Sequence, residues 1–197
     1  MFKRTQPGYS LVELLIVLAI LGLFLGIALP SFNTMRRRAG LRVAAGELRG
    51  IFHLARQRAI TRGAKCGVKF FLAGGEWHYS LYDDGDRDGV RSDDIARGID
   101  TPVTAPRPAI RETDAVTIGL LKRRIKDPDG ERLNPDRSPV QFGRSDICSF
   151  TPMGESTPGT IYLTDRGSDL YALRVYGMTA KIRTLRYDAA AAVWAEK

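Results

Sequence analysis

The chain has 197 residues, a formal net charge of +8 at neutral pH and only two histidines. This length suits one domain of about 150 residues behind an N-terminal helix. The modest positive surplus serves solubility more often than it marks an anionic partner. The sequence also lacks the nucleophile-elbow motif of hydrolases, the zinc-protease motif and the phosphate-binding loop. A non-enzymatic protein is therefore expected.

The N-terminal region begins with a short basic leader, residues 1–8, and continues as a long apolar run. Glu13 is the one charge near the start of that run, and no other charge occurs from Leu14 through Met35. A helix of about 20 apolar residues crosses a bilayer, so residues 9–30 are predicted to form a hydrophobic membrane-spanning helix. A carboxylate inside such a helix is unfavourable unless it is neutralised, so Glu13 is expected to have a partner.

The stretch from Gly8 to Val17, Gly-Tyr-Ser-Leu-Val-Glu-Leu-Leu-Ile-Val, resembles the class III signal of type IV pilins and type II secretion pseudopilins. The resemblance implies that a prepilin peptidase cuts after Gly8 and methylates the new amino terminus at Tyr9. It implies other pilins or pseudopilins as filament partners, with Glu13 neutralised by the Tyr9 amine of a neighbouring subunit. A plain membrane anchor with Glu13 at the level of the lipid headgroups is the alternative.

The same resemblance implies a single-pass protein of the cell inner membrane with a periplasmic head domain, residues 31–197, that later enters a pilus or pseudopilus. Basic residues beyond the apolar run, Arg36, Arg37, Arg38 and Arg42, favour the opposite orientation when counted alone. Long downstream domains translocate largely regardless of their charge. The orientation implied by the resemblance is therefore preferred.

A helical pattern resumes beyond Pro30. Apolar residues recur at three- and four-residue steps, which predicts the amphipathic second half of one long helix. This helix is expected to end near Arg62, with Gly63 supplying the C-terminal cap. The residues of the apolar stripe are Leu41, Ala45, Leu48, Phe52, Ala55 and Ala59.

After the helix the apolar period changes to two, which predicts strands. Residues 100–111 are proline-rich and are expected to form a connector or an edge segment, and residues 122–139 are expected to form a charged loop. A long helix followed by a run of strands predicts an α+β domain in which an antiparallel sheet packs on the helix. The predicted strands are 65–71 and 76–82, paired as a hairpin, then 116–121, 146–150, 159–164, 170–176 and 180–187.

Two further stretches resemble GspH/FimT-type minor pilins. The pattern from Leu48 to Arg62 is similar to the end of that family's long helix, and Phe150-Thr-Pro-Met-Gly154 is similar to its Phe-x-Pro-x-Gly turn. The resemblance implies a type IV pilin-like fold. It also implies a minor pseudopilin or pilin, a structural subunit involved in protein secretion or pilus assembly.

Basic residues near the C-terminus suggest a second function. Residues 179–183, Thr-Ala-Lys-Ile-Arg, stand where the GspH/FimT family often has Thr-Gly-Arg-Val-Arg, so glycine and arginine are replaced by alanine and lysine. In FimT-like competence pilins this ending contacts DNA, which makes Lys181, Arg183 and Arg186 the candidate DNA-binding residues. The lysine weakens this inference, because lysine and arginine meet phosphate differently.

An acidic segment, Asp84-Gly-Asp86-Arg-Asp88-Gly-Val90, resembles the first part of a calcium loop, with carboxylates at alternate positions and a backbone carbonyl at the seventh. The twelfth position, normally a bidentate glutamate, is Ile95. An ordinary acidic turn between strands explains the same residues. Calcium is the one cofactor that the sequence suggests.

The two cysteines, Cys66 and Cys148, lie far apart in the sequence. In an oxidising periplasm they are candidates for one disulfide between an early and a late strand. Two buried free thiols are the alternative.

Overall fold

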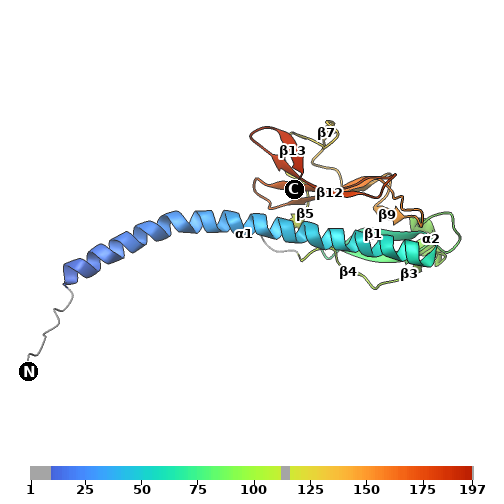
Figure 1. The fold of residues 1–197 in the computed structure, drawn as a ribbon, viewed down its shortest axis with the longest axis horizontal. Coiled ribbons are helices and arrows are strands. Elements are labelled where there is room, and N and C mark those ends of the chain that lie inside the picture. Colours follow the sequence, from blue (N-terminus) through green and yellow to red (C-terminus); the bar gives the residue numbers. More distant parts are fainter. Residues whose placement is uncertain (1–9, 112–115, 197) are drawn as a thin grey trace, which may run out of the picture. The chain divides into compact units, whose positions relative to one another are not determined.

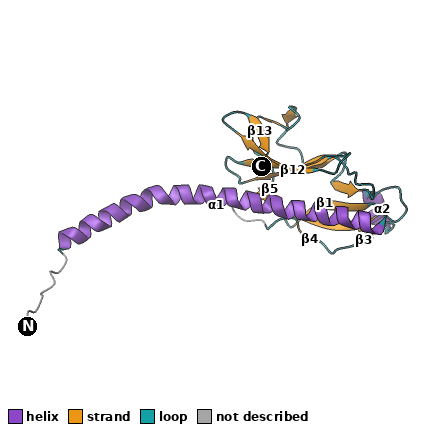
Figure 2. Ribbon diagram, in the orientation of Figure 1, coloured by secondary structure: helices purple, strands orange, loops and turns teal. Residues whose placement is uncertain are grey.

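The computed structural model describes residues 10–111 and 116–196. Gly8 and Tyr9, the predicted processing residues, lie outside the described part. The chain divides into two compact units, Met1–Arg37 and Arg38–Lys197. One helix, α1 (Leu11–Arg62), runs through the described part of the first unit and into the second. The structure thus contains the single long N-terminal helix that the sequence predicts (Figure 2).

The second half of α1 buries the predicted apolar stripe. Leu41, Ala45, Leu48, Phe52, Ala55 and Ala59 are all buried in the main core. The helix ends at Arg62, and Gly63 follows with a φ of 63°. Only glycine adopts this left-handed conformation without strain, which explains why the helix stops here.

A first antiparallel sheet follows the helix, with strand order β3-β2-β1-β9 and β4 also paired to β2 (Figure 1). The hairpin is the predicted one, because β1 (Cys66–Ala73) and β2 (Glu76–Asp83) join through Gly74 and Gly75, whose φ angles are 61° and 86°. Two successive positive φ angles define the turn that fits the twist of a hairpin. The predicted proline-rich edge is confirmed by the short strands β3 (Thr101–Pro102) and β4 (Arg107–Pro108).

A second sheet holds the later strands in the order β13-β12-β11-β10-β5, with β8 also paired to β10. The sequence predicted a single sheet, and the structure divides the strands between two. The division arises because β9 pairs with β1 of the first sheet, whereas β10 turns away to pair with β11. The second sheet contains β5 (Thr117–Ile118), β8 (Val140–Phe142), β10 (Gly159–Thr164), β11 (Leu170–Val175), β12 (Ile182–Asp188) and β13 (Val193–Glu196).

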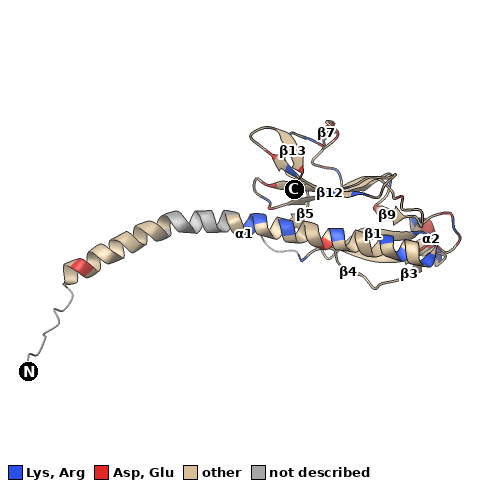
Figure 3. Ribbon diagram, viewed as in Figure 1, with Lys and Arg blue, Asp and Glu red and all other residues tan. Residues whose placement is uncertain are grey.

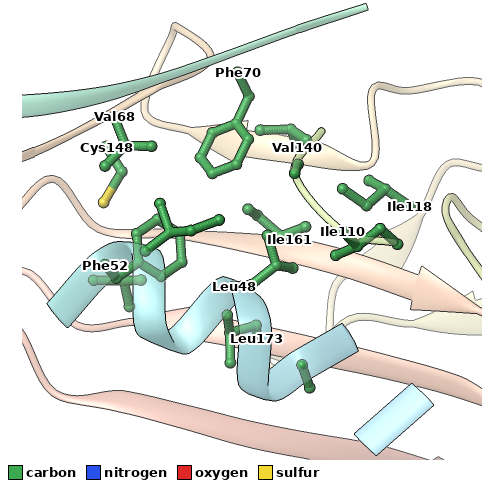
Figure 4. Packing of buried hydrophobic residues seen from close by; sticks show 14 of the residues in the cluster. Leu48, Phe52, Val68, Phe70, Ile110, Ile118, Val140, Cys148, Ile161 and Leu173 are labelled. Atoms are coloured by element: carbon green, nitrogen blue, oxygen red, sulfur yellow. The ribbon is translucent and has the colours of Figure 1, made fainter. Parts of the chain in front are cut away.

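The main core lies between α1 and the inner faces of the two sheets. Figure 4 shows Phe52 of α1 beside Leu48, with Phe70 of β1, Ile161 of β10 and Leu173 of β11 directed into the same cluster. Every second residue of β10 and β11 enters this core, as the two-residue period of a strand requires. The order of helix then strands therefore produces the α+β fold class expected from the sequence.

The other face of the second sheet is covered by residues 122–139, which were predicted from the sequence to form a charged loop. Within residues 122–139 the short strands β6 (Ile125–Lys126) and β7 (Arg132–Leu133) form a hairpin. Its apolar residues join a second buried cluster: Leu121, Ile125, Leu133, Tyr162, Leu170, Ala172, Leu185 and Tyr187. The loop prediction was wrong here because Ile125 and Leu133 are isolated among charges and carry no visible period.

Two smaller elements complete the fold. The strand β9 (Ile147–Phe150) pairs with β1 and confirms a predicted strand. The short helix α2 (Ser92–Arg97) was not predicted, and it directly follows the acidic segment.

Candidate functional site

The described start of α1 positions Glu13. Ser10 precedes the helix, and its side-chain oxygen accepts a hydrogen bond of 3.3 Å from the amide of Val12. This is the usual role of serine at a helix N-cap, where it satisfies a free amide. Glu13 then lies in the first turn, where the positive end of the helix dipole favours a carboxylate.

The described part of the first unit has solvent-exposed apolar side chains. From Leu11 to Phe24 all large apolar side chains are exposed, and Phe24 alone is 63% exposed. A helix that is apolar all round is stable only in apolar surroundings, such as a protein core or a lipid bilayer. Apart from Glu13 near its start, the charged residues of α1 begin at Arg36 and continue through the second half of the helix (Figure 3).

Two glycines leave open space on this helix. A Cβ built at Gly22 or at Gly26 would meet no atom within 4 Å among the described residues. The four-residue spacing puts both glycines on one face, where a second helix can approach closely. The geometry suits helix packing against another subunit.

None of the described helices combines the length and the hydropathy that a membrane crossing requires. The predicted spanning segment, residues 9–30, includes Tyr9, which is outside the described residues.

The structure does not bring the three candidate DNA-binding residues onto one surface. Arg186 is engaged by the buried carboxylate of Asp169, with its Nη2 atom 2.8 Å from Oδ1. This contact raises the pKa of the Arg186 guanidinium. Asp169 also accepts a hydrogen bond of 3.2 Å from Arg38 of α1, so Arg186 faces the helix and ties it to β12.

Arg183 lies on the opposite face of β12, because it is three positions from Arg186 and successive strand residues alternate between faces. Its Nη1 atom is 3.5 Å from a carboxylate oxygen of Glu196, and its guanidinium lies 5.5 Å from the centre of the Tyr176 ring. Lys181 is exposed at the start of this region. Of the three candidates, Arg186 pairs with the buried Asp169, Arg183 lies beside the exposed Glu196 on the other face, and Lys181 alone projects freely from the described part of the chain.

The cysteines are free thiols, both buried in the main core. They lie on the neighbouring strands β1 and β9, but Cys66 is opposite Phe150 and Cys148 is opposite Val68. Such diagonal neighbours are about 7–8 Å apart, beyond the Cα separation of about 4.4–6.8 Å that a disulfide spans. Of the two arrangements that the sequence leaves open, the structure therefore has the two buried thiols and not the bridge.

Burial also makes the thiols unreactive. It raises the pKa of Cys66 to about 12 and the pKa of Cys148 well above its ordinary value. The reactive species is the thiolate. We expect the native protein to resist thiol reagents over minutes and to expose two reactive thiols once it is denatured without reductant. Counting thiols with a chromogenic disulfide reagent measures this, and finding none in the denatured protein would show that a bridge had formed.

An ion pair that the sequence did not indicate fastens the end of α1 to the first sheet. Arg58 donates two hydrogen bonds of 2.7 Å, one to each carboxylate oxygen of Asp83 at the end of β2. The hydrogen bond from Arg58 holds the pKa of Asp83 below its ordinary value. This bidentate ion pair places the acidic segment, residues 84–90, beside the last turns of α1.

The acidic segment brings the predicted calcium ligands together. Asp84, Asp86 and Asp88 each offer a carboxylate oxygen within 4.8 Å of the others. Val90, the predicted carbonyl donor, is buried. Ile95, at the twelfth position, lies in α2 and supplies no oxygen from its side chain.

Asp100 supports this segment and was missed in the sequence. It is fully buried, and its two oxygens accept hydrogen bonds from the backbone amides of Gly85 (3.1 Å) and Arg91 (2.9 Å). Asp100 follows α2 in the sequence and lies outside the acidic segment, so no local sequence pattern indicates that its carboxylate binds the backbone of that segment.

Comparisons with known proteins agree with the geometry. The family described as "Type II transport protein GspH" matches residues 44–178, and the prokaryotic N-terminal methylation motif matches residues 3–29. The first match spans the second half of α1 and most of both sheets, and the second spans the helix start with Glu13.

Two relatives are similar to the chain. The type II secretion system core protein G of Aeromonas hydrophila is 27% identical over 158 residues, which cover 79% of this chain and 90% of that protein. The pilin-like protein PilA1 of Thermus thermophilus is 43% identical over 70 residues, which cover 36% of this chain and 44% of that protein. No solved structure matches the chain.

A methylation motif on an uncovered apolar helix, joined to a head that matches the GspH family over more than half of the chain, identifies this protein as a member of the GspH family of type II transport proteins and as a pseudopilin- or pilin-type subunit.

Proposed function

We propose that the chain is a minor, purely structural subunit of a type II secretion pseudopilus or a closely related pilus. Cleavage after Gly8 frees the amine of Tyr9, which is then methylated. Before assembly the apolar half of α1 anchors the protein in the inner membrane with the head in the periplasm. The same helix then moves into the filament core.

The observation that carries this proposal is the exposed apolar helix of the first unit. Leu14, Leu18 and Leu21 are each more than half exposed among the described residues. Leaving one such side chain in water forgoes roughly 1.5–3 kcal/mol of burial free energy. Summed over the helix, this loss requires a lipid or protein environment, and a filament of packed helices provides one.

Glu13 gives such a filament its register. In an apolar core an unpaired carboxylate is strongly unfavourable, whereas one paired to a positive amine is tolerated. A neighbouring subunit's Tyr9 amine is a suitable positive group, since Tyr9 stands only four residues before Glu13 in the sequence and becomes the amino terminus after cleavage. Each subunit would then stop sliding where its Glu13 meets that amine.

Substitution of Gly8 tests the processing step. We expect Gly8→Val to leave an uncut precursor that still contains residues 1–8, because a branched side chain replaces the hydrogen of the small residue at the cleavage site. Intact-mass measurement of the membrane-extracted protein distinguishes the precursor from the methylated product. Thr5→Ala, a change within the leader, is the matched control and should be processed normally. A methylated Tyr9 terminus in Gly8→Val would refute the proposal.

A further inference from the structure

The acidic segment between β2 and α2 contains a buried oxygen without a partner. Asp84 is 8% exposed, and its Oδ1 atom accepts a hydrogen bond of 2.8 Å from the amide of Arg87. Its Oδ2 atom is buried and has no hydrogen-bond partner among the described residues. Buried carboxylate oxygens are almost always hydrogen-bonded, ion-paired or bound to a metal, so this oxygen needs a partner that the described residues do not supply.

The neighbouring carboxylates point to a cation as that ligand. Asp84, Asp86 and Asp88 offer oxygens within 4.8 Å of one another, although like charges at this distance repel. A multivalent cation among the three would remove the repulsion and satisfy Asp84 Oδ2 at the same time.

The rest of the loop is held in place before any ion arrives. The carboxylate of Asp100 accepts hydrogen bonds from the backbone amides of Gly85 and Arg91, which lie at the two ends of the loop. A Cβ at Gly85 would lie 2.0 Å from the carbonyl oxygen of Ile99, so only glycine fits there. Val90 packs against Gly67 of β1, where a Cβ would come within 2.8 Å of its side chain. Because these contacts fix the loop, an ion would not have to order it.

One positive side chain currently occupies part of the site. Arg91 forms an ion pair with Asp88, and both side chains are more than 40% exposed. An exposed pair of this kind contributes between zero and about 1 kcal/mol. A divalent ion that contacts three carboxylates at once can displace it.

We propose that residues 84–90 bind one calcium ion through the carboxylates of Asp84, Asp86 and Asp88. The carbonyl of Val90 and water molecules complete the six to eight oxygens that calcium takes. An all-oxygen set disfavours zinc, which prefers nitrogen and sulfur. Three carboxylates within one loop also suit calcium better than magnesium, which keeps most of its water.

The ion binds weakly and stabilises the head. Without a bidentate glutamate at position 95, the dissociation constant falls in the range of extracellular calcium modules, about 0.1–1 mM. The ion also joins the end of β2 to the start of α2, beside the Arg58–Asp83 pair. Calcium therefore acts here as a structural brace for the part of the head nearest the end of α1.

Thermal unfolding of the full-length chain in detergent micelles tests this proposal. We expect about 10 mM calcium chloride to raise Tm by about 3–10 °C, and magnesium at equal concentration to raise it by less than half as much. Asp86→Asn combined with Asp88→Asn should abolish the calcium shift. Asp93→Asn, which removes the same kind of charge from an exposed position next to the loop, should retain it. Asp84→Asn is a secondary variant, because its buried side chain also supports the fold.

Calorimetric titration of the same protein supplies a second readout. Arg91→Gln removes the competing cation and should tighten calcium binding by up to about fivefold. A calcium shift that is absent at 10 mM, that magnesium reproduces fully, or that survives in the Asp86/Asp88 double variant would overturn the proposal. These outcomes do not involve Gly8 processing, so the calcium site and the filament role fail or succeed separately.

Discussion

Glu13→Ala is expected to reduce incorporation of the chain into filaments by about 100-fold or more. Removing one partner of a buried ion pair leaves the other charge unpaired and costs about 3–5 kcal/mol, and every 1.4 kcal/mol is a factor of ten. In this variant the unpaired group is the Tyr9 amine of the neighbouring subunit. The measurement is the amount of protein in the sheared filament fraction relative to the membrane fraction, by immunoblot.

The control for this experiment must change a charge outside the helix. Glu155→Ala removes an exposed carboxylate from the turn before β10 and should leave incorporation unchanged. Glu13→Asp keeps the charge on a shorter side chain and should restore part of the incorporation. If Glu13→Ala entered filaments at the level of the unchanged chain, Glu13 would be no more than part of a membrane anchor.

Phe52→Ala is expected to destabilise the head domain by about 3–5 kcal/mol, the usual range for removing a buried aromatic ring. Phe52 is fully buried, and its ring lies 5.9 Å from Phe70, 5.7 Å from Phe142 and 6.1 Å from Phe150, measured between ring centres. These rings belong to α1 and to both sheets, so the cavity would form where all three layers meet. A loss of this size lowers Tm by roughly 6–20 °C in a protein of this length.

Leu54→Ala is the matched control on the same helix. Leu54 is 50% exposed, so its truncation should change the free energy of unfolding by less than about 1 kcal/mol. Chemical denaturation of both variants measures the difference. Equal destabilisation by the two substitutions would mean that the three layers do not meet at Phe52.

Local patterns in the sequence predicted the elements whose causes are local. The stripe from Leu41 to Ala59 follows the 3.6-residue period of one helix, and all of its members are buried as expected. Gly63 ends the helix, and Gly74 with Gly75 makes the hairpin turn, because each adopts a positive φ that other residues avoid. The methylation motif is likewise a run of adjacent residues, and the matching family motif confirms it.

The sequence failed where a residue's partner is far away in the chain. The sequence did not indicate that Arg186 pairs with Asp169, which also accepts a hydrogen bond from Arg38, and Arg38 and Asp169 are 131 residues apart. Cys66 and Cys148 were a plausible pair by type, yet the register of β1 with β9 offsets them. A shift of register changes which side chains meet without changing either strand's pattern.

By itself, then, the sequence determined the processing signal, the long helix with its buried stripe, the hairpin and the α+β class, because periodicity and turn chemistry are properties of neighbouring residues. Only the tertiary structure decided that the strands form two sheets, that Arg186 pairs with the buried Asp169, and that Asp100 braces the acidic loop while one oxygen of Asp84 is left without a partner among the described residues. Those features depend on which distant segments pack together, and burial free energy summed over the whole core selects that arrangement.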